Sequence, residues 1–221
     1  MPISPMKRLL FIFAASILLL AGCLAKETPE AQLYEVMEKA VNAEKQFEAQ
    51  QDPLMELETK EKEIFDKIMG LGLKEYKQIS ILSDEALAIA AKRKEHIGLE
   101  RQSLDDSRVL FKEASGILEN IKNPELKKKA ETLYKTMNER YTAHELLYKE
   151  YMKALEGDQK LYTSLKEKDI TLENLEGQVN SLNTHYTRIM ETNDKFNELT
   201  EKYNKEKLEF YKMAGLGNKD S

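Results

Sequence analysis

Residues 175–210 read LEGQVNSLNTHYTRIMETNDKFNELTEKYNKEKLEF, and their spacing decides the fold class. Apolar and small polar side chains recur there in alternating steps of four and three residues, which is typical of a helix that packs one face in a bundle. The predicted seam consists of Leu175, Val179, Leu182, Tyr186, Ile189, Asn193, Phe196, Thr200, Tyr203, Lys207 and Phe210. This stretch therefore predicts one long helix that buries a single stripe.

Three earlier segments repeat this rhythm. In the first, the stripe is Leu33, Met37, Ala40, Phe47, Leu54, Phe65 and Ile68, and in the third it is Leu126, Ala130, Leu133, Met137, Leu147, Tyr151 and Leu161. In the second segment, Ile89, Leu110, Ala114, Ile117 and Ile121 fit the stripe, but Arg93, His96 and Glu100 also fall on it and weaken its middle. The chain thus contains four segments with helical periodicity.

Helix-start signals divide these segments at nearly even intervals. Thr28-Pro29-Glu30 and Asn123-Pro124-Glu125 each place a capping side chain before a proline in the first turn, with an acid beside the positive end of the helix dipole. Ser83-Asp84-Glu85 and Thr171-Leu172-Glu173 are weaker starts, and Asp52-Pro53 predicts a kink or break in the first segment.

Short turns between long helices force antiparallel neighbours. We therefore predict an all-α fold, an elongated antiparallel up-and-down four-helix bundle with coiled-coil-like packing. A three-helix bundle with the residues before Pro53 loosely attached is the alternative.

Composition supports a helical fold and excludes some partners. The 221 residues are 41% hydrophobic and 33% charged, with 9 Gly, 5 Pro and no Trp, which is typical of helical bundles. The formal net charge of −5 argues against nucleic acid as a partner.

The amino terminus reads as an export signal that ends in a lipidation site. Lys7 and Arg8 precede the apolar stretch 9–20, which is about 12 residues long and too short to span a bilayer as a helix. Leu20, Ala21 and Gly22 then lead directly into Cys23, the only cysteine of the chain, and together they resemble a lipobox. We expect cleavage before Cys23 and a diacylglyceryl group on its thiol, whose two acyl chains suffice for stable anchoring.

These features predict the layout of the chain. Residues 1–22 form the lipoprotein signal peptide, 23–28 the acylated cysteine with a short tether, 29–214 the helical bundle domain and 215–221 a flexible tail. A Gram-positive source is favoured; in a cell with two membranes, Leu24 after the cysteine would favour the outer one.

Motifs for chemistry are missing from the sequence. There is no G-x-S-x-G motif, and His96, His144 and His185 lie in three different segments without the spacing of a metal site. Runs such as Glu61-Lys62-Glu63 mix acids with lysines and are typical of solvated helix faces. The sequence therefore predicts a non-enzymatic protein with no catalytic residues, no cofactor and no metal.

Aromatic residues give the one candidate contact surface. Tyr134, Tyr141, Tyr148 and Tyr162 recur at multiples of seven, with Leu155 filling the gap, so they lie along one line beside the apolar seam. Tyrosine rings stack on sugar faces while their hydroxyls form hydrogen bonds, which suits a glycan or protein partner. The alternative is that these rings widen the core.

The lipobox, the Lys/Glu-rich helical sequence and the two proline-marked helix starts resemble the YkyA-like family of cell-wall-binding lipoproteins from Bacillus, Staphylococcus and their relatives. The resemblance covers the whole chain. It implies a helical bundle on the outer face of a Gram-positive membrane, and it supplies no catalytic residues.

We therefore expect a lipid-anchored, extracytoplasmic protein that binds the cell wall or acts as an envelope scaffold. Its partners would be the membrane, through the diacylglyceryl cysteine, and peptidoglycan or another envelope polymer. The alternative function is an extracytoplasmic chaperone or carrier for exported polypeptides or lipids.

Overall fold

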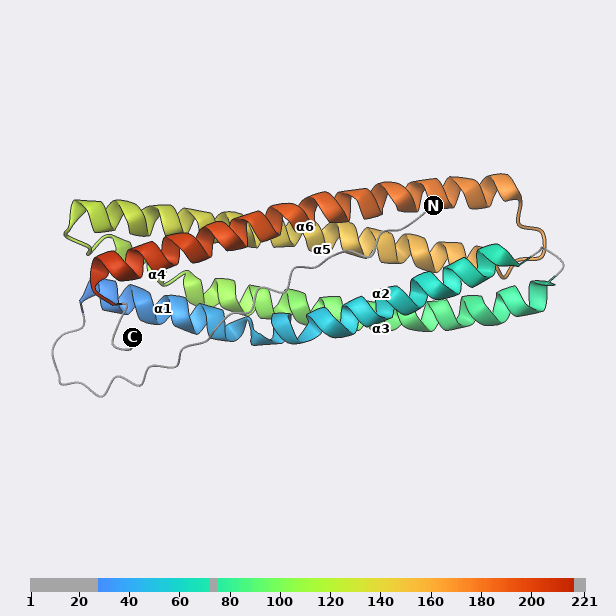
Figure 1. The fold of residues 1–221 in the computed structure, drawn as a ribbon, viewed down its shortest axis with the longest axis horizontal. Helices are drawn as coiled ribbons and strands as arrows, with labels where there is room; N and C mark the ends of the chain where they lie inside the picture. Colours follow the sequence, from blue (N-terminus) through green and yellow to red (C-terminus); the bar gives the residue numbers. More distant parts are fainter. Residues whose placement is uncertain (1–27, 72–74, 217–221) are drawn as a thin grey trace. The chain divides into compact units, whose positions relative to one another are not determined.

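A computed structural model describes residues 28–71 and 75–216 of the chain. These residues form helices and turns and include no strand, which confirms the predicted all-α class (Figure 1). The helices are α1 (Pro29–Ala43), α2 (Lys45–Gly70), α3 (Tyr76–Phe111), α4 (Ala114–Leu118), α5 (Pro124–Ser164) and α6 (Leu172–Ala214).

Three of the four predicted helix starts are confirmed. Thr28 Oγ1 accepts a hydrogen bond from the amide of Ala31 at 3.2 Å and caps α1. Asn123 Oδ1 accepts from two amides at the start of α5, at 2.9 and 3.2 Å. Thr171 Oγ1 accepts from the amide of Asn174 at 3.2 Å at the start of α6. Each cap satisfies amides that have no partner within their own helix.

The fourth predicted start, at Ser83, was wrong. Ser83 is fully buried inside α3, seven residues after that helix begins at Tyr76. At Asp52-Pro53, where a kink or break was predicted, there is no break, because α2 runs through Pro53; the helical interruption lies at Glu44, between α1 and α2. Capping residue types also occur inside helices, so they mark a start only where the helix is in fact interrupted.

Gly215 ends α6. Its φ of 69° lies in the left-handed region, which glycine adopts without steric cost. The amide of Leu216 then donates to the carbonyl of Tyr211 at 2.9 Å, as in a Schellman motif. The rest of the predicted tail, residues 217–221, lies outside the described residues.

The described chain divides into two compact units. Unit 1 comprises residues 47–71, 75–101 and 144–194, and unit 2 comprises residues 28–46, 102–143 and 195–216.

Unit 1 is a four-helix bundle of segments from α2, α3, α5 and α6. In Figure 1, α2 lies beside α3 and α5 lies beside α6. Both pairs are antiparallel, since Gln50 contacts His96 while Glu61 contacts Arg93, and Asp158 contacts Tyr186 while Ser164 contacts Gln178. One apolar cluster of this unit is Leu54, Ala90, Ile97, Leu147, Tyr151, Ala154, Leu155 and Ile189. A second is Ile64, Ile68, Ile79, Leu82, Ala86, Ile89 and Tyr162.

Unit 2 is built from α1, α4 and segments of α3, α5 and α6. The residues before Pro53 are not loosely attached as in the three-helix alternative, because Leu33, Val36, Met37 and Ala40 of α1 are buried. Phe111 of α3 stacks on Tyr134 of α5 at 5.5 Å between ring centroids and contacts the Tyr203 ring of α6 edge-on at 6.4 Å. Aromatic side chains therefore fill much of this core.

No helix within residues 28–71 and 75–216 combines the length and the apolar character needed to cross a bilayer.

Candidate functional site

The predicted lipidation site lies outside the described residues. Leu20, Ala21, Gly22 and Cys23 fall in the segment 1–27, so acylation of Cys23 stays a prediction from the sequence. The side chains with unusual chemistry in the described part of the chain are two buried arginines, one in each unit.

Arg93 of α3 is 1% exposed and lies at the centre of unit 1. Its Nη1 donates to Glu61 Oε2 of α2 at 2.6 Å and to Asp158 Oδ2 of α5 at 3.2 Å. Its Nε donates to the hydroxyl of Tyr151 at 3.0 Å, and the guanidinium lies over that ring at 5.0 Å from the centroid. Arg93 thus joins side chains of α2, α3 and α5.

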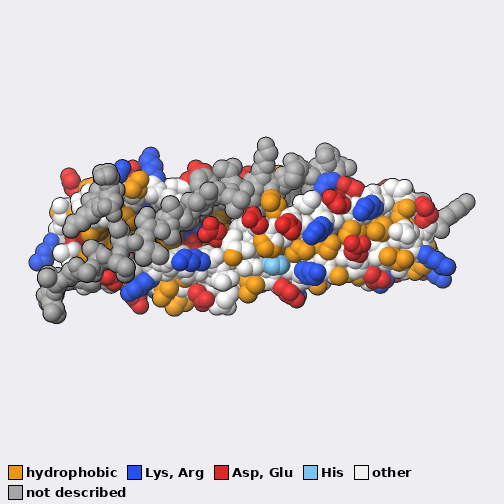
Figure 2. All heavy atoms as spheres, turned by 60° about the horizontal axis from the view of Figure 1, so that its bottom comes forward, with side chains coloured by type: hydrophobic (Ala, Val, Ile, Leu, Met, Phe, Trp, Pro, Cys, Tyr) orange, Lys and Arg blue, Asp and Glu red, His pale blue; other side chains and the backbone are white. Residues whose placement is uncertain are grey.

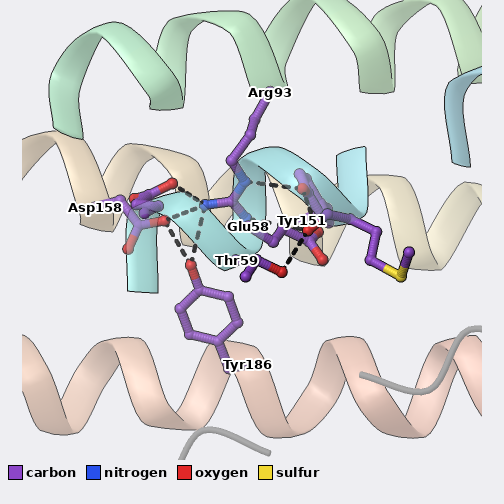
Figure 3. Close-up of polar contacts among 8 residues, drawn as sticks. Glu58, Thr59, Arg93, Tyr151, Asp158 and Tyr186 are labelled. Atoms are coloured by element: carbon purple, nitrogen blue, oxygen red, sulfur yellow. Dashed lines mark hydrogen bonds and ion pairs between the residues drawn. The ribbon is translucent and has the colours of Figure 1, made fainter. Parts of the chain in front are cut away.

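Hydroxyl groups complete this network (Figure 3). The hydroxyl of Tyr186, from α6, donates to Asp158 Oδ2 at 2.6 Å, and that of Tyr151 donates to Glu58 Oε1 at 2.6 Å. We call this set, with the neighbouring Tyr162, the Arg93 cluster; its members are Glu58, Glu61, Arg93, Tyr151, Asp158, Tyr162 and Tyr186. Every helix of unit 1 contributes to it, so the cluster links the four helices of unit 1 through buried hydrogen bonds.

Burial shifts the acids of the Arg93 cluster toward the protonated form. It raises the pKa of Glu61 to about 7, although Arg93 acts in the opposite direction, and the negative charge of Asp158 raises it further. The pKa of Asp158 is also raised by burial. Two acids that lie so close to one arginine titrate as a coupled pair.

Arg140 of α5 occupies the core of unit 2 and is 2% exposed. Its Nη1 and Nη2 donate to Glu44 Oε1 and Oε2 at 2.8 and 2.7 Å, a bidentate pair, and its Nε donates to Thr200 Oγ1 of α6 at 2.8 Å. Ser107 of α3 donates to Glu44 Oε1 at 2.8 Å and shares a 2.7 Å hydrogen bond with the hydroxyl of Tyr141. We call Arg140 and Glu44 the Arg140 pair. The interruption between α1 and α2 places the Glu44 carboxylate where Arg140 can bind it.

The predicted line of tyrosines is divided between core and surface. Tyr141 and Tyr162 are each 3% exposed, and Leu155 between them is buried too. Tyr134 and Tyr148 are half-buried; Tyr134 stacks on Phe111, and Tyr148 lies under the guanidinium of Arg101 at 5.6 Å. Glycan contact stays a prediction, and it now depends on Tyr134 and Tyr148, because the other two rings are enclosed.

The three histidines have separate surroundings. Nδ1 of His96 lies 2.6 Å from Gln50 Oε1, and Nδ1 of His185 lies 3.3 Å from Glu150 Oε2. His144 is buried and meets the Phe47 ring edge-on at 5.6 Å between centroids. They therefore lie in three different contacts within unit 1.

The face of the molecule shown in Figure 2 carries charges of both signs. On this face, lysine and arginine side chains alternate with aspartate and glutamate, and no large area carries a single sign.

Unit 2 has a groove of about 650 Å³ beside α5 and α6, lined by Glu125, Lys128, Lys129, Thr132, Lys202, Lys205, Glu206, Glu209 and Met213. Four lysines and three glutamates line it, so the groove has little preference for either charge.

The fold is all-α, and the amino-terminal sequence resembles a lipobox; together these features are typical of a helical lipoprotein. Residues 28–213 match the YkyA family, described as "Putative cell-wall binding lipoprotein", and the chain belongs to this family. A curated relative, the "Uncharacterized lipoprotein YkyA" of Bacillus subtilis (strain 168), is 42% identical over 209 residues, which cover 95% of this chain and 93% of the relative.

A solved structure shows the same fold. It is a 1.6 Å crystal structure of a conserved protein of unknown function from Staphylococcus aureus, with a TM-score of 0.62 and 21% sequence identity. The match covers 85% of this chain and 97% of that chain. At this identity the likeness concerns the fold alone.

Sequence reasoning missed both arginine sites. Arg93 was noticed only as an interruption of an apolar stripe, and Glu61 was assigned to a solvated face, whereas it is 4% exposed. A charged residue on an otherwise apolar stripe was the available signal, because such a residue must be solvated, paired or protonated. No comparable local signal marks Glu44.

Proposed function

We propose that the chain is a non-enzymatic lipoprotein, held on the outer face of the cytoplasmic membrane by the diacylglyceryl group of Cys23, that binds or scaffolds a component of the cell envelope. The family description names cell-wall binding, which supports a cell-wall polymer as the partner, and peptidoglycan is the polymer that we propose. The mixed charge of the face shown in Figure 2 and the formal net charge of −5 argue for a neutral or zwitterionic polymer rather than a strong polyanion.

One observation carries the non-enzymatic part of this proposal. Three of the buried acids, Glu44, Glu61 and Asp158, bind the two buried arginines across the helices. A fourth, Glu100, accepts a hydrogen bond from the side chain of Gln51. A general acid or base must reach a substrate proton within a cleft. Glu61 and Asp158 are each only 4% exposed, so a substrate cannot reach them. Their hydrogen bonds to Arg93 join the helices of unit 1.

The anchoring step is tested by metabolic labelling of the full-length protein with palmitate. We expect label in the membrane fraction for the wild type and none for Cys23→Ala, because the thiol is the acyl acceptor. An unlabelled wild-type protein that keeps residues 1–22 would contradict the anchor.

Wall binding is tested separately with a soluble form that begins at residue 24. Retention on purified peptidoglycan above that of a charge-matched helical bundle supports the proposal. Replacing Tyr134 and Tyr148 by serine tests the predicted glycan contact, and the matched control is Tyr76→Ser, a half-buried tyrosine outside the line. No retention, combined with protection of an unfolding client protein from aggregation, would favour the chaperone alternative.

A further inference from the structure

The Arg93 cluster holds more acid than base. Arg93 is its one cation, while Glu61 and Asp158 are each 4% exposed and Glu58, with a side chain 20% exposed, reaches within 3.9 Å of Arg93 Nη2. The other titratable groups that face the two buried acids are the phenols of Tyr151, Tyr162 and Tyr186. One guanidinium therefore serves two enclosed carboxyl groups, a deficit that the interior of a bundle does not tolerate without cost.

The hydrogen bonds show which acid is worse supported as an anion. Asp158 Oδ2 accepts from both Arg93 Nη1 and the hydroxyl of Tyr186. Glu61 Oε2 accepts from Arg93, and the nearby Tyr162 phenol also acts to lower the pKa of this carboxyl group, but the buried Oε1 of Glu61 has no hydrogen-bond partner within the described part of the chain. A protonated carboxyl leaves less charge unsatisfied there, so Glu61 is the favoured carrier of a proton.

We propose that the Arg93 cluster is a proton-operated latch: one proton held by Glu61 and Asp158 lets the four helices of unit 1 close on Arg93, and its loss loosens unit 1. This inference concerns the regulation of the fold and goes beyond the proposed function. Unit 2 lacks the same deficit, because Arg140 faces a single carboxylate, Glu44, in its bidentate contact.

The pKa of Glu61 gives the direction and the range of the response. In the folded unit it is raised from 4.5 to about 7, so the folded state binds the proton more tightly than the open state does. The resulting stabilisation is complete below pH 4.5, decreases as the pH rises from 4.5 to 7, and is absent above pH 7. Between pH 5.5 and 8 the opening equilibrium of unit 1 should rise about tenfold or more.

Hydrogen exchange read by mass spectrometry on the full-length protein tests the latch. Peptides of residues 54–65 and 151–162 report on unit 1, and peptides of residues 33–44 and 130–141 report on unit 2. After correction for the intrinsic pH dependence of exchange, we expect unit 1 to lose about tenfold or more of its protection between pH 5.5 and 8. Unit 2 should change less than threefold.

Two isosteric variants make the test specific to the acids. Glu61→Gln and Asp158→Asn each remove one titrating group while keeping its shape, so protection in unit 1 should depend much less on pH. Glu63→Gln, an exposed acid of the same helix, is the matched control and should keep the wild-type response.

Carbon-13 NMR of labelled glutamate gives an independent readout. The side-chain carboxyl resonance of Glu61 should titrate with a midpoint near 7. Unchanged protection of unit 1 in the wild type between pH 5.5 and 8 would overturn the latch. So would a wild-type pH response in both isosteric variants.

Discussion

The two units use the same device with different charge balances. Each buries one arginine over an aromatic ring, with Arg93 5.0 Å from the centroid of Tyr151 and Arg140 4.7 Å from that of Phe196. Arg140 binds one carboxylate through two parallel hydrogen bonds, whereas Arg93 divides one nitrogen, Nη1, between two carboxylates. Burial of an arginine is thus not enough to define its role, since the number of acids around it decides whether the site is a fixed ion pair or one that titrates.

Removing each arginine should produce the largest effects. Arg93→Met leaves two buried carboxyl groups without their cation, and we expect it to lower the free energy of unfolding by about 4 kcal/mol at pH 8. Arg140→Met leaves one buried carboxylate, that of Glu44, without its cation, and it should lower the free energy of unfolding by about 3 kcal/mol. Denaturant unfolding followed by circular dichroism measures both. A larger loss of unfolding free energy for Arg140→Met than for Arg93→Met would contradict the argument from the number of buried acids beside each arginine.

Removing one acid from each unit should affect the free energy of unfolding very differently in the two units. Glu44→Gln leaves Arg140 as an unpaired buried cation, so we expect a loss of about 3 kcal/mol. Glu61→Gln should lower the free energy of unfolding by less than about 1 kcal/mol at pH 8. Asp158 still balances the charge of Arg93, and the repulsion between the Glu61 and Asp158 carboxylates disappears. Equal losses in the same unfolding experiment would show that Glu61 acts as an ordinary ion-pair partner.

The tyrosine hydroxyls should give intermediate effects. The hydroxyl of Tyr151 accepts from Arg93 and donates to Glu58, whereas that of Tyr141 bonds to Ser107. Tyr151→Phe should therefore lower the free energy of unfolding by about 2 kcal/mol, and Tyr141→Phe should lower it by about 1 kcal/mol. Thermal unfolding of the two variants at matched pH compares them, and the reverse order would count against the charged hydrogen bonds of the Arg93 cluster.

Helix caps should give the smallest effects. Asn123, which caps α5 in unit 2, accepts from two amides, while Thr171, which caps α6 in unit 1, accepts from one. Asn123→Ala should cost about 1 kcal/mol and Thr171→Ala about 0.5 kcal/mol. Exchange of the capped amides provides a local check. Thr187→Ala is a control, because its exposed hydroxyl donates to the carbonyl of Asn183 inside α6 and caps no helix.

Much of the fold was predictable because its signals are local. The alternating steps along residues 175–210 identified the seam of α6, in which Leu182, Ile189, Phe196 and Phe210 are buried. The proline-marked caps located the starts of α1 and α5 to the residue. The candidate site was predicted much less well, since the tyrosine line was identified while Glu44, Glu61, Arg140 and Asp158 were not.

The sequence by itself determined the helical class, the positions of three helix starts and the membership of a lipoprotein family. It also predicts the acylated Cys23. These properties depend on residues within a few positions of one another, where a cap, a proline or a periodic stripe has a direct local effect.

Only the tertiary structure decided where the first segment is interrupted and which acids meet each arginine. Glu44 and Arg140 are 96 positions apart, and Arg93 and Asp158 are 65 apart. Such pairs form only once the register between facing helices is set, and that register results from the packing of the whole core. The same packing determines whether a buried acid keeps its charge or holds a proton.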